Sequence, residues 1–129
     1  MNKSYVVTGG TGTLGRAIVQ HLLTVESPAS VTVFSRSENE QHKMRSEIKD
    51  ERLHFALGDV RDYESVRAAL RHADIVIHAS AMKQVPACEY FPDEAIKTNV
   101  GGAQNIVRAI TEERLSVECV VGILSLIHI

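Results

Sequence analysis

The segment Thr8-Gly9-Gly10-Thr11-Gly12-Thr13-Leu14-Gly15 decides the fold of this chain. It follows the short apolar run Ser4–Thr8 and precedes a stretch of helical period, so the sequence predicts a strand, a glycine turn and a helix. We expect Gly9 to permit the tight turn, Gly12 to let backbone N–H groups approach a pyrophosphate, and Gly15 to let the helix pack closely. The positive end of the helix dipole would then face the phosphates. A purely structural strand–helix turn is the alternative.

Short apolar runs alternate with stretches of helical period along the whole chain. Strands are expected at Ser4–Thr8, Ser30–Ser35, Leu53–Leu57, Asp74–Ala79 and Val117–Ile123. Two helices with one buried face are expected from Leu14, Ala17, Ile18, Leu22 and Val25, and from Ile96, Val100, Ala103, Val107 and Ile110. Continuously apolar strands fit a parallel sheet covered on both faces. The predicted fold class is α/β: a doubly wound parallel sheet of the Rossmann type with strand order 3-2-1-4-5 and a ligand crevice at the carboxyl ends of the first and fourth strands.

Size and charge limit the classes of function. With 129 residues and 44% hydrophobic residues, the chain suits one domain with its own core. Fourteen Lys and Arg residues against 16 Asp and Glu residues give a net charge of -2, which favours a small-molecule ligand over nucleic acid or a membrane surface. The N-terminal residues lack the apolar stretch of a signal peptide, and the apolar run Cys119–Ile127 is too short to span a bilayer, so a cytoplasmic location and a buried strand are expected.

The sequence contains no motif for metal binding or for hydrolysis. The six histidines show no metal-ligand spacing, and there is no Gly-x-Ser-x-Gly nucleophile elbow. Cys88 and Cys119 form no Cys-x-x-Cys pair, so we expect reduced thiols in the core. The sequence therefore predicts no metal site.

The end of the second expected strand reads Phe34-Ser35-Arg36-Ser37. Sites that prefer NAD usually place an acidic residue there to bind the ribose 2′-hydroxyl. Arg36 instead offers paired charge-assisted hydrogen bonds to a 2′-phosphate, so NADP is favoured over NAD. Two alternatives stay open: Arg36 is a solvated surface side chain, or Glu38 reaches the ribose.

Three later segments, together with the glycine turn, resemble a known family: Gly58-Asp59-Val60-Arg61-Asp62, the stretch from His78 to Tyr90, and the stretch from Glu94 to Val100. Over residues 3–123 the chain resembles extended short-chain dehydrogenases/reductases. Within them it looks most like bacterial UDP-N-acetylglucosamine 4,6-dehydratases of the 5-inverting (dehydratase/5-epimerase) group, which act in polysaccharide and glycan biosynthesis. The resemblance implies an NAD(P)-binding Rossmann domain at residues 1–123 and a tail at 124–129 outside the family pattern. It also implies a C-terminal truncation, with the substrate domain absent.

The resemblance implies a cofactor site at the strand ends. Gly9, Thr11, Gly12, Thr13, Leu14 and Gly15 would form the pyrophosphate turn, Ser35 and Arg36 the adenosine phosphate site, Asp59 and Val60 the adenine site, and Ala79, Ser80 and Lys83 the nicotinamide side. Lys83, Thr98 and Asn99 would contact the substrate. Structural alternatives remain for four of these positions: a turn cap for Asp59, a solvated side chain for Lys83, and hydrogen bonding inside a helix for Thr98 and Asn99. Ser80 stands where the family usually has Ala.

The resemblance also implies chemistry that this chain does not carry. In the family, hydride transfer to NADP oxidises C4 of the UDP-sugar, water leaves across C5–C6, and C5 is inverted. A Tyr-x-x-x-Lys pair activates the hydroxyl there, but Tyr5, Tyr63 and Tyr90 are followed four positions later by Gly9, Arg67 and Glu94. No Ser-Thr-Asp-Lys follows the fifth expected strand either.

We therefore expect the NADP-binding part of a UDP-N-acetylglucosamine 4,6-dehydratase/5-epimerase, with no catalytic residue in this chain. The full-length enzyme is expected to be a homo-oligomer. A non-catalytic NADP-binding or sensing module, or another nucleotide-sugar epimerase or reductase of the same superfamily, is the alternative.

Overall fold

The computed structural model of the chain describes residues 2–79, 102–115 and 117–122. Its parallel strands form one sheet in the order β3-β2-β1-β4-β5, which confirms the predicted fold class and strand order. The strands are β1 (Ser4–Thr8), β2 (Ser30–Ser35), β3 (Leu53–Leu57), β4 (Ile75–His78) and β5 (Cys119–Gly122). The described helices are α1 (Thr13–Val25), α2 (Glu38–Glu47), α3 (Tyr63–Leu70) and α6 (Gly102–Glu112). β4 and β5 are shorter than the predicted Asp74–Ala79 and Val117–Ile123, and the carboxylate of Asp74 instead accepts the N–H of Ser4 at 2.9 Å.

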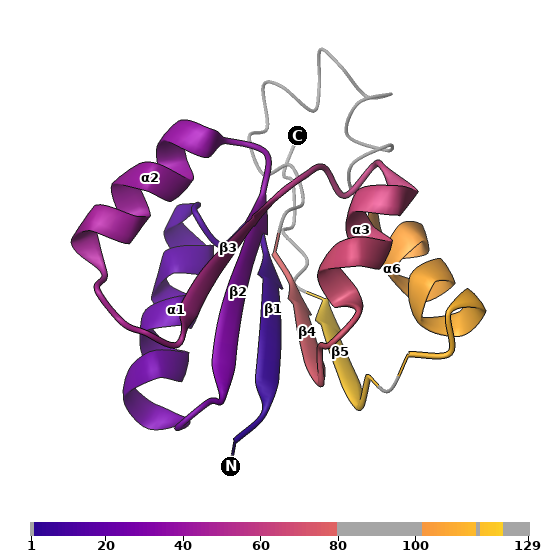
Figure 1. The fold of residues 1–129 in the computed structure, drawn as a ribbon, viewed down its shortest axis with the longest axis horizontal. Helices are drawn as coiled ribbons and strands as arrows, with labels where there is room; N and C mark the ends of the chain where they lie inside the picture. Colours follow the sequence, from indigo (N-terminus) through magenta and orange to yellow (C-terminus); the bar gives the residue numbers. More distant parts are fainter. Residues whose placement is uncertain (1, 80–101, 116, 123–129) are drawn as a thin grey trace, which may run out of the picture.

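Helices cover both faces of the sheet. Figure 1 shows α1 and α2 on one side and α3 and α6 on the other. Successive residues of β1 enter different cores because side chains alternate along a strand. Val6 packs in the core under α3 and α6, whereas Tyr5 and Val7 pack in the core under α1 and α2. This two-sided burial is why the central strand reads as an unbroken apolar run.

The buried face of α1 matches the predicted one only in part, at Leu22 and the partly buried Ile18. Gly15, Val19, Leu22 and Leu23 are buried, whereas Leu14, Ala17 and Val25 are exposed. Gly15 lies directly against the backbone of the preceding turn, and this contact sets the rotation of the helix about its axis. Helical spacing alone could not select that face, because apolar residues lie on more than one side of the helix.

The predicted face of α6 is also partly wrong. Gly102, Ile106 and Ala109 are buried, but Val107 is 59% exposed. Gly102 packs against Val60, which turns Val107 outward. Ile96 and Val100, predicted on the same face, lie outside the described residues.

β5 is not the buried strand that the sequence predicts. Val120 and Val121 are each 43% exposed, and Cys119 is an exposed free thiol rather than a core residue. The reason is position, since β5 is at one end of the strand order and, among the described residues, pairs only with β4. Cys88 lies outside the described residues.

The described residues contain neither a membrane-spanning helix nor a cluster of metal-ligating side chains. None of their helices has both the length and the apolar character needed to cross a membrane. No group of three or more His, Cys, Asp or Glu side chains in the same ranges could hold a metal ion.

Candidate functional site

The glycine turn after β1 lies at the carboxyl edge of the sheet. Gly9 has a φ of 70°, in the left-handed region that favours glycine, and its N–H donates to the carbonyl of Phe34 at 2.9 Å. The N–H of Gly12 donates to the carbonyl of Gly9 at 3.1 Å and closes the turn. A Cβ on Gly15 would lie 2.2 Å from the Gly9 carbonyl oxygen, whereas one on Gly12 would meet nothing closer than 3.5 Å. Packing therefore requires glycine at 15, while a Cβ at position 12 would make only an ordinary contact.

The N-terminus of α1 differs from that of α2. Gly12 is the N-cap of α1, with no side-chain cap and no acidic residue in the first turn. α2 is capped by Ser37, whose hydroxyl accepts the N–H of Glu40 at 3.2 Å, and it has Glu38 and Glu40 in its first turn. The first turn of α1 thus offers backbone N–H groups and the positive end of its dipole without an acid or a side-chain cap of its own. Such an end is suited to a bound anion.

The ends of β1 and β4 are joined beside this turn. The Thr8 hydroxyl lies 2.8 Å from Nδ1 of His78, and the Ala79 N–H donates to both the carbonyl and the hydroxyl oxygen of Thr8 at 3.1 Å. All three residues are buried, and burial lowers the pKa of the His78 imidazole. The imidazole and the hydroxyl link the ends of the two strands where the predicted crevice lies. Sequence reasoning missed Thr8 and His78, although polar residues that end apolar strands are a usable signal.

On the other side of the turn, the ends of β2 and β3 bring the predicted adenosine residues together. Arg36 is 64% exposed in its side chain, and its Nη1 lies 3.9 Å from Oδ2 of Asp59. The Asp59 carboxylate also accepts the backbone N–H of Arg61 at 2.9 Å, so it forms the turn cap considered as its alternative. Ser35 is bound by α2, because its hydroxyl accepts a hydrogen bond from Nε2 of Gln41 at 2.9 Å. The guanidinium of Arg36 is therefore the most accessible of these groups.

α6 supports the turn that follows β3. The amide nitrogen of Asn105 donates to the carbonyl of Val60 at 2.8 Å, and a Cβ on Gly102 would lie 2.9 Å from a methyl carbon of Val60. Sequence reasoning predicted Val60 but missed Gly102, Asn105 and Arg61. Gly and Asn are poor helix formers, so their presence inside a helical stretch was the available signal.

The structure places most of the predicted cofactor residues at one edge of the sheet. Gly9, Thr11, Gly12, Thr13, Leu14 and Gly15 lie on the turn and the start of α1, and Ser35, Arg36, Asp59, Val60 and Ala79 lie at or just beyond the ends of β2, β3 and β4. Ser80, Lys83, Thr98 and Asn99 fall outside the described residues. Glu38, the alternative ribose contact, is in the first turn of α2.

Known proteins share this part of the fold. The UDP-glucose 4-epimerases of Rickettsia bellii (strain OSU 85-389) and Rickettsia prowazekii are each 40% identical over 119 residues, which is 90% of this chain and 35% of the relative. Pen from Bacillus thuringiensis, solved by X-ray crystallography, superposes with a TM-score of 0.86 at 40% identity and covers 94% of this chain and 36% of that one. The dTDP-glucose 4,6-dehydratase DesIV from Streptomyces venezuelae, solved with NAD and TYD bound, superposes with a TM-score of 0.74 at 26% identity. The match covers 88% of this chain and 37% of that chain.

The family comparison agrees with these relatives. The chain spans about a third of the length of the curated relatives that it matches. The model of one family, described as "Polysaccharide biosynthesis protein", matches residues 5–125, which is nearly the whole chain. The chain therefore belongs to the polysaccharide biosynthesis protein family.

Proposed function

We propose that this chain binds NADP at the carboxyl edge of its sheet, as the dinucleotide-binding part of a nucleotide-sugar epimerase or dehydratase. The observation that carries the proposal is the N-terminus of α1, which has no side-chain cap and begins at the exposed Gly12, where a Cβ would make only an ordinary contact with the turn. Two similar proteins, each 26% identical, were solved with NAD bound: DesIV and the UDP-glucose 4-epimerase of Thermus thermophilus.

The residues present fit such a dinucleotide. The first N–H groups of α1 would hold the pyrophosphate, and Asp59 and Val60 would border the adenine. Arg36 extends from the end of β2 with an exposed guanidinium, where a 2′-phosphate on the adenosine ribose would accept paired hydrogen bonds. When bound, NADP supplies a hydride acceptor for a sugar carbon. Ala79, which is buried at the end of β4, would border the nicotinamide side of the cofactor.

Cofactor choice tests the role of Arg36. We expect the unaltered chain to bind NADP more tightly than NAD in calorimetry, and Arg36→Asp to reverse that order. Each charge-assisted contact to phosphate contributes roughly 1.5–3 kcal/mol, so NADP affinity should fall about tenfold or more. Arg71→Asp is the matched control, because it makes the same charge change at the far end of α3. Equal affinity of the unaltered chain for both cofactors would contradict the assignment of NADP.

For the sugar nucleotide, we infer UDP-N-acetylglucosamine and the reaction of a 4,6-dehydratase/5-epimerase. The support is the resemblance of the segments around Asp59, Lys83 and Asn99 to that group. A second candidate is 4-epimerisation of UDP-glucose, favoured by the relatives at 40% identity that carry that name. Both reactions begin by oxidising C4 of the sugar, so the dinucleotide site serves either one.

The products separate these two candidates. A protein in which this chain is followed by the part that its relatives carry would be incubated with NADP and each sugar nucleotide in turn. Dehydration removes one water, which mass spectrometry detects, whereas epimerisation leaves the mass unchanged and alters the proton NMR spectrum. An isomer of UDP-glucose without any dehydrated product would establish the second candidate and exclude the first.

A further inference from the structure

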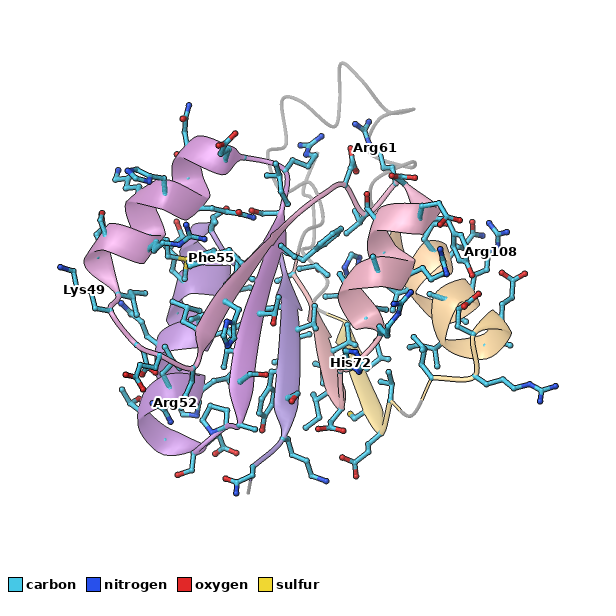
Figure 2. All side chains as sticks on the ribbon, in the orientation of Figure 1. Lys49, Arg52, Phe55, Arg61, His72 and Arg108 are labelled. Carbon is cyan, nitrogen blue, oxygen red and sulfur yellow. The ribbon has the colours of Figure 1, made fainter. Side chains whose placement is uncertain are left out.

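Two guanidinium groups approach one carboxylate at the adenosine side of the site. Asp59 follows β3, Arg36 follows β2, and Arg61 begins the segment that leads into α3, where Figure 2 shows it beyond the carboxyl ends of the strands. Nη2 of Arg61 lies 2.9 Å from Oδ2 of Asp59, whereas Nη1 of Arg36 lies 3.9 Å from the same oxygen. Asp59 therefore forms hydrogen bonds with Arg61 and only an ion pair with Arg36.

The two carboxylate oxygens of Asp59 are held differently. Oδ1 accepts the backbone N–H of Arg61 at 2.9 Å, a contact that needs no side chain at position 61, and it also accepts from Nε of Arg61 at 3.2 Å. Oδ2 is held by the guanidinium, with Nε at 3.1 Å and Nη2 at 2.9 Å. Partial burial acts to raise the pKa of the Asp59 carboxyl, but the hydrogen bonds from Arg61, and the weaker attraction of Arg36, outweigh it and leave that pKa below its usual value. The carboxylate is thus charged, and Arg61 determines where Oδ2 points.

We propose that Arg61 is a positioning residue for cofactor choice: it holds the Asp59 carboxylate and so keeps the Arg36 guanidinium available for a phosphate on the adenosine ribose. This rests on the proposed function. Without the side chain of Arg61, Oδ1 stays on the backbone while Oδ2 is released beside Arg36. The carboxylate then pairs with Arg36 and sets a negative charge next to the phosphate, and both effects disfavour the phosphorylated ribose.

The preference of the chain for a phosphate on the ribose 2′-hydroxyl measures the positioning role of Arg61 directly. The probes are adenosine 2′,5′-bisphosphate and AMP, which share the base, the ribose and the 5′-phosphate. Calorimetry on the full 129-residue chain gives the ratio of their affinities. We expect the unaltered chain to prefer the bisphosphate, and Arg61→Ala to reduce that preference about tenfold, the effect of losing one charge-assisted contact.

A second substitution separates positioning from direct contact. In Arg61→Ala with Asp59→Asn, no carboxylate is left to occupy Arg36. Both probes carry the same adenine, so loss of the Asp59 carboxylate weakens them alike, and the ratio of their affinities should return to near that of the unaltered chain. If Arg61 bound the phosphate itself, the preference would stay low in the double variant, and the proposal would be wrong. Arg71→Ala, which removes a guanidinium at the C-terminal end of α3, should leave the preference unchanged.

Carbon-13 NMR of the Asp59 carboxyl adds a measurement that does not depend on ligand. In Arg61→Ala its pKa should rise toward the ordinary value, and an unchanged pKa would overturn the positioning role. Thermal unfolding should be nearly unchanged, because exposed ion pairs contribute little to stability. An unaltered chain without preference for the bisphosphate would refute the NADP assignment. A preference that survives in Arg61→Ala would refute only the role of Arg61.

Discussion

At the scale of single residues, the glycines of the turn differ in what they do. Gly15 is needed by the fold, because a Cβ there would lie 2.2 Å from a backbone oxygen. Gly10 is constrained by a side chain, since its Cβ would lie 2.8 Å from a methyl carbon of Val33. Gly12 has an extended backbone, with φ -74° and ψ 172°, is exposed, and would place a Cβ no closer than 3.5 Å to another atom. Of these three, only Gly12 is therefore glycine without a structural demand, which agrees with a role in ligand approach.

This difference predicts separate outcomes for two substitutions. Gly12→Val should keep the circular dichroism and the unfolding midpoint of the parent while abolishing NADP binding, because its methyl groups occupy the space that the pyrophosphate needs. Gly15→Ala should instead lower the free energy of unfolding by at least about 1–3 kcal/mol, the usual cost of overpacking. Ala17→Val, one turn along the exposed face of α1, is the control for a branched side chain. Native NADP affinity in a folded Gly12→Val chain would mean that the turn is structural only.

At the scale of elements, α6 connects the helix layer to the adenine side of the site. Its residue Asn105 holds the carbonyl of Val60, and Gly102 lets the helix approach that residue closely. α6 also contacts α3, because the guanidinium of Arg108 on α6 lies 3.8 Å from the ring centre of Tyr63 on α3. The turn carrying Asp59 is thus fixed from the α6 side as well as by Arg61.

We predict that Asn105→Ala weakens the binding of every adenine nucleotide by a similar factor. Loss of the hydrogen bond to Val60 should cost about 1 kcal/mol of stability and loosen the turn that borders the adenine. AMP, NAD and NADP affinities, measured by calorimetry, should each fall several-fold while the ratio of NADP to NAD stays constant. Gln104→Ala, at the exposed neighbouring position, is the control. Unchanged AMP affinity would show that α6 does not support the adenine site.

At the scale of the whole molecule, the sheet has one well-covered centre and two different edges. β2, β1 and β4 lie inside the strand order, whereas β3 and β5 lie at its ends. Exposed apolar side chains occur on both edge strands: Leu57 on β3 is 57% exposed, and Val121 on β5 is 43% exposed. Edge strands with unpaired backbone groups promote association between sheets.

We predict that the 129-residue chain self-associates through β5, because this strand is apolar along most of its length. Val121→Lys should raise the protein concentration at which dimers appear in sedimentation velocity, since a charged side chain on an edge opposes pairing. Leu57→Lys makes the same change on the opposite edge and should have little effect. Equal suppression by both substitutions would argue against an interface at β5.

The sequence determined the parallel sheet, its strand order and the place of the glycine turn. These depend on local signals: apolar runs of strand length, helical period between them, and glycines at fixed spacing before a helix. Because the carboxyl ends of parallel strands meet at one edge, the sequence also predicts that the turn, Arg36, Asp59 and Ala79 lie at the same edge of the sheet.

Only the tertiary structure decided which side chains face the cores and which groups hold the site. The buried faces of α1 and α6 are set by Gly15 and Gly102, each through contact with a residue outside its own helix. The contact between Arg36 and Asp59 joins two strand ends, and the bond from Asn105 to Val60 spans 45 positions of sequence. Periodicity measures spacing along one element, so it contains no information on such contacts between elements. The exposure of β5 has the same origin, because an edge strand and a central strand have similar apolar sequences and differ only in their neighbours.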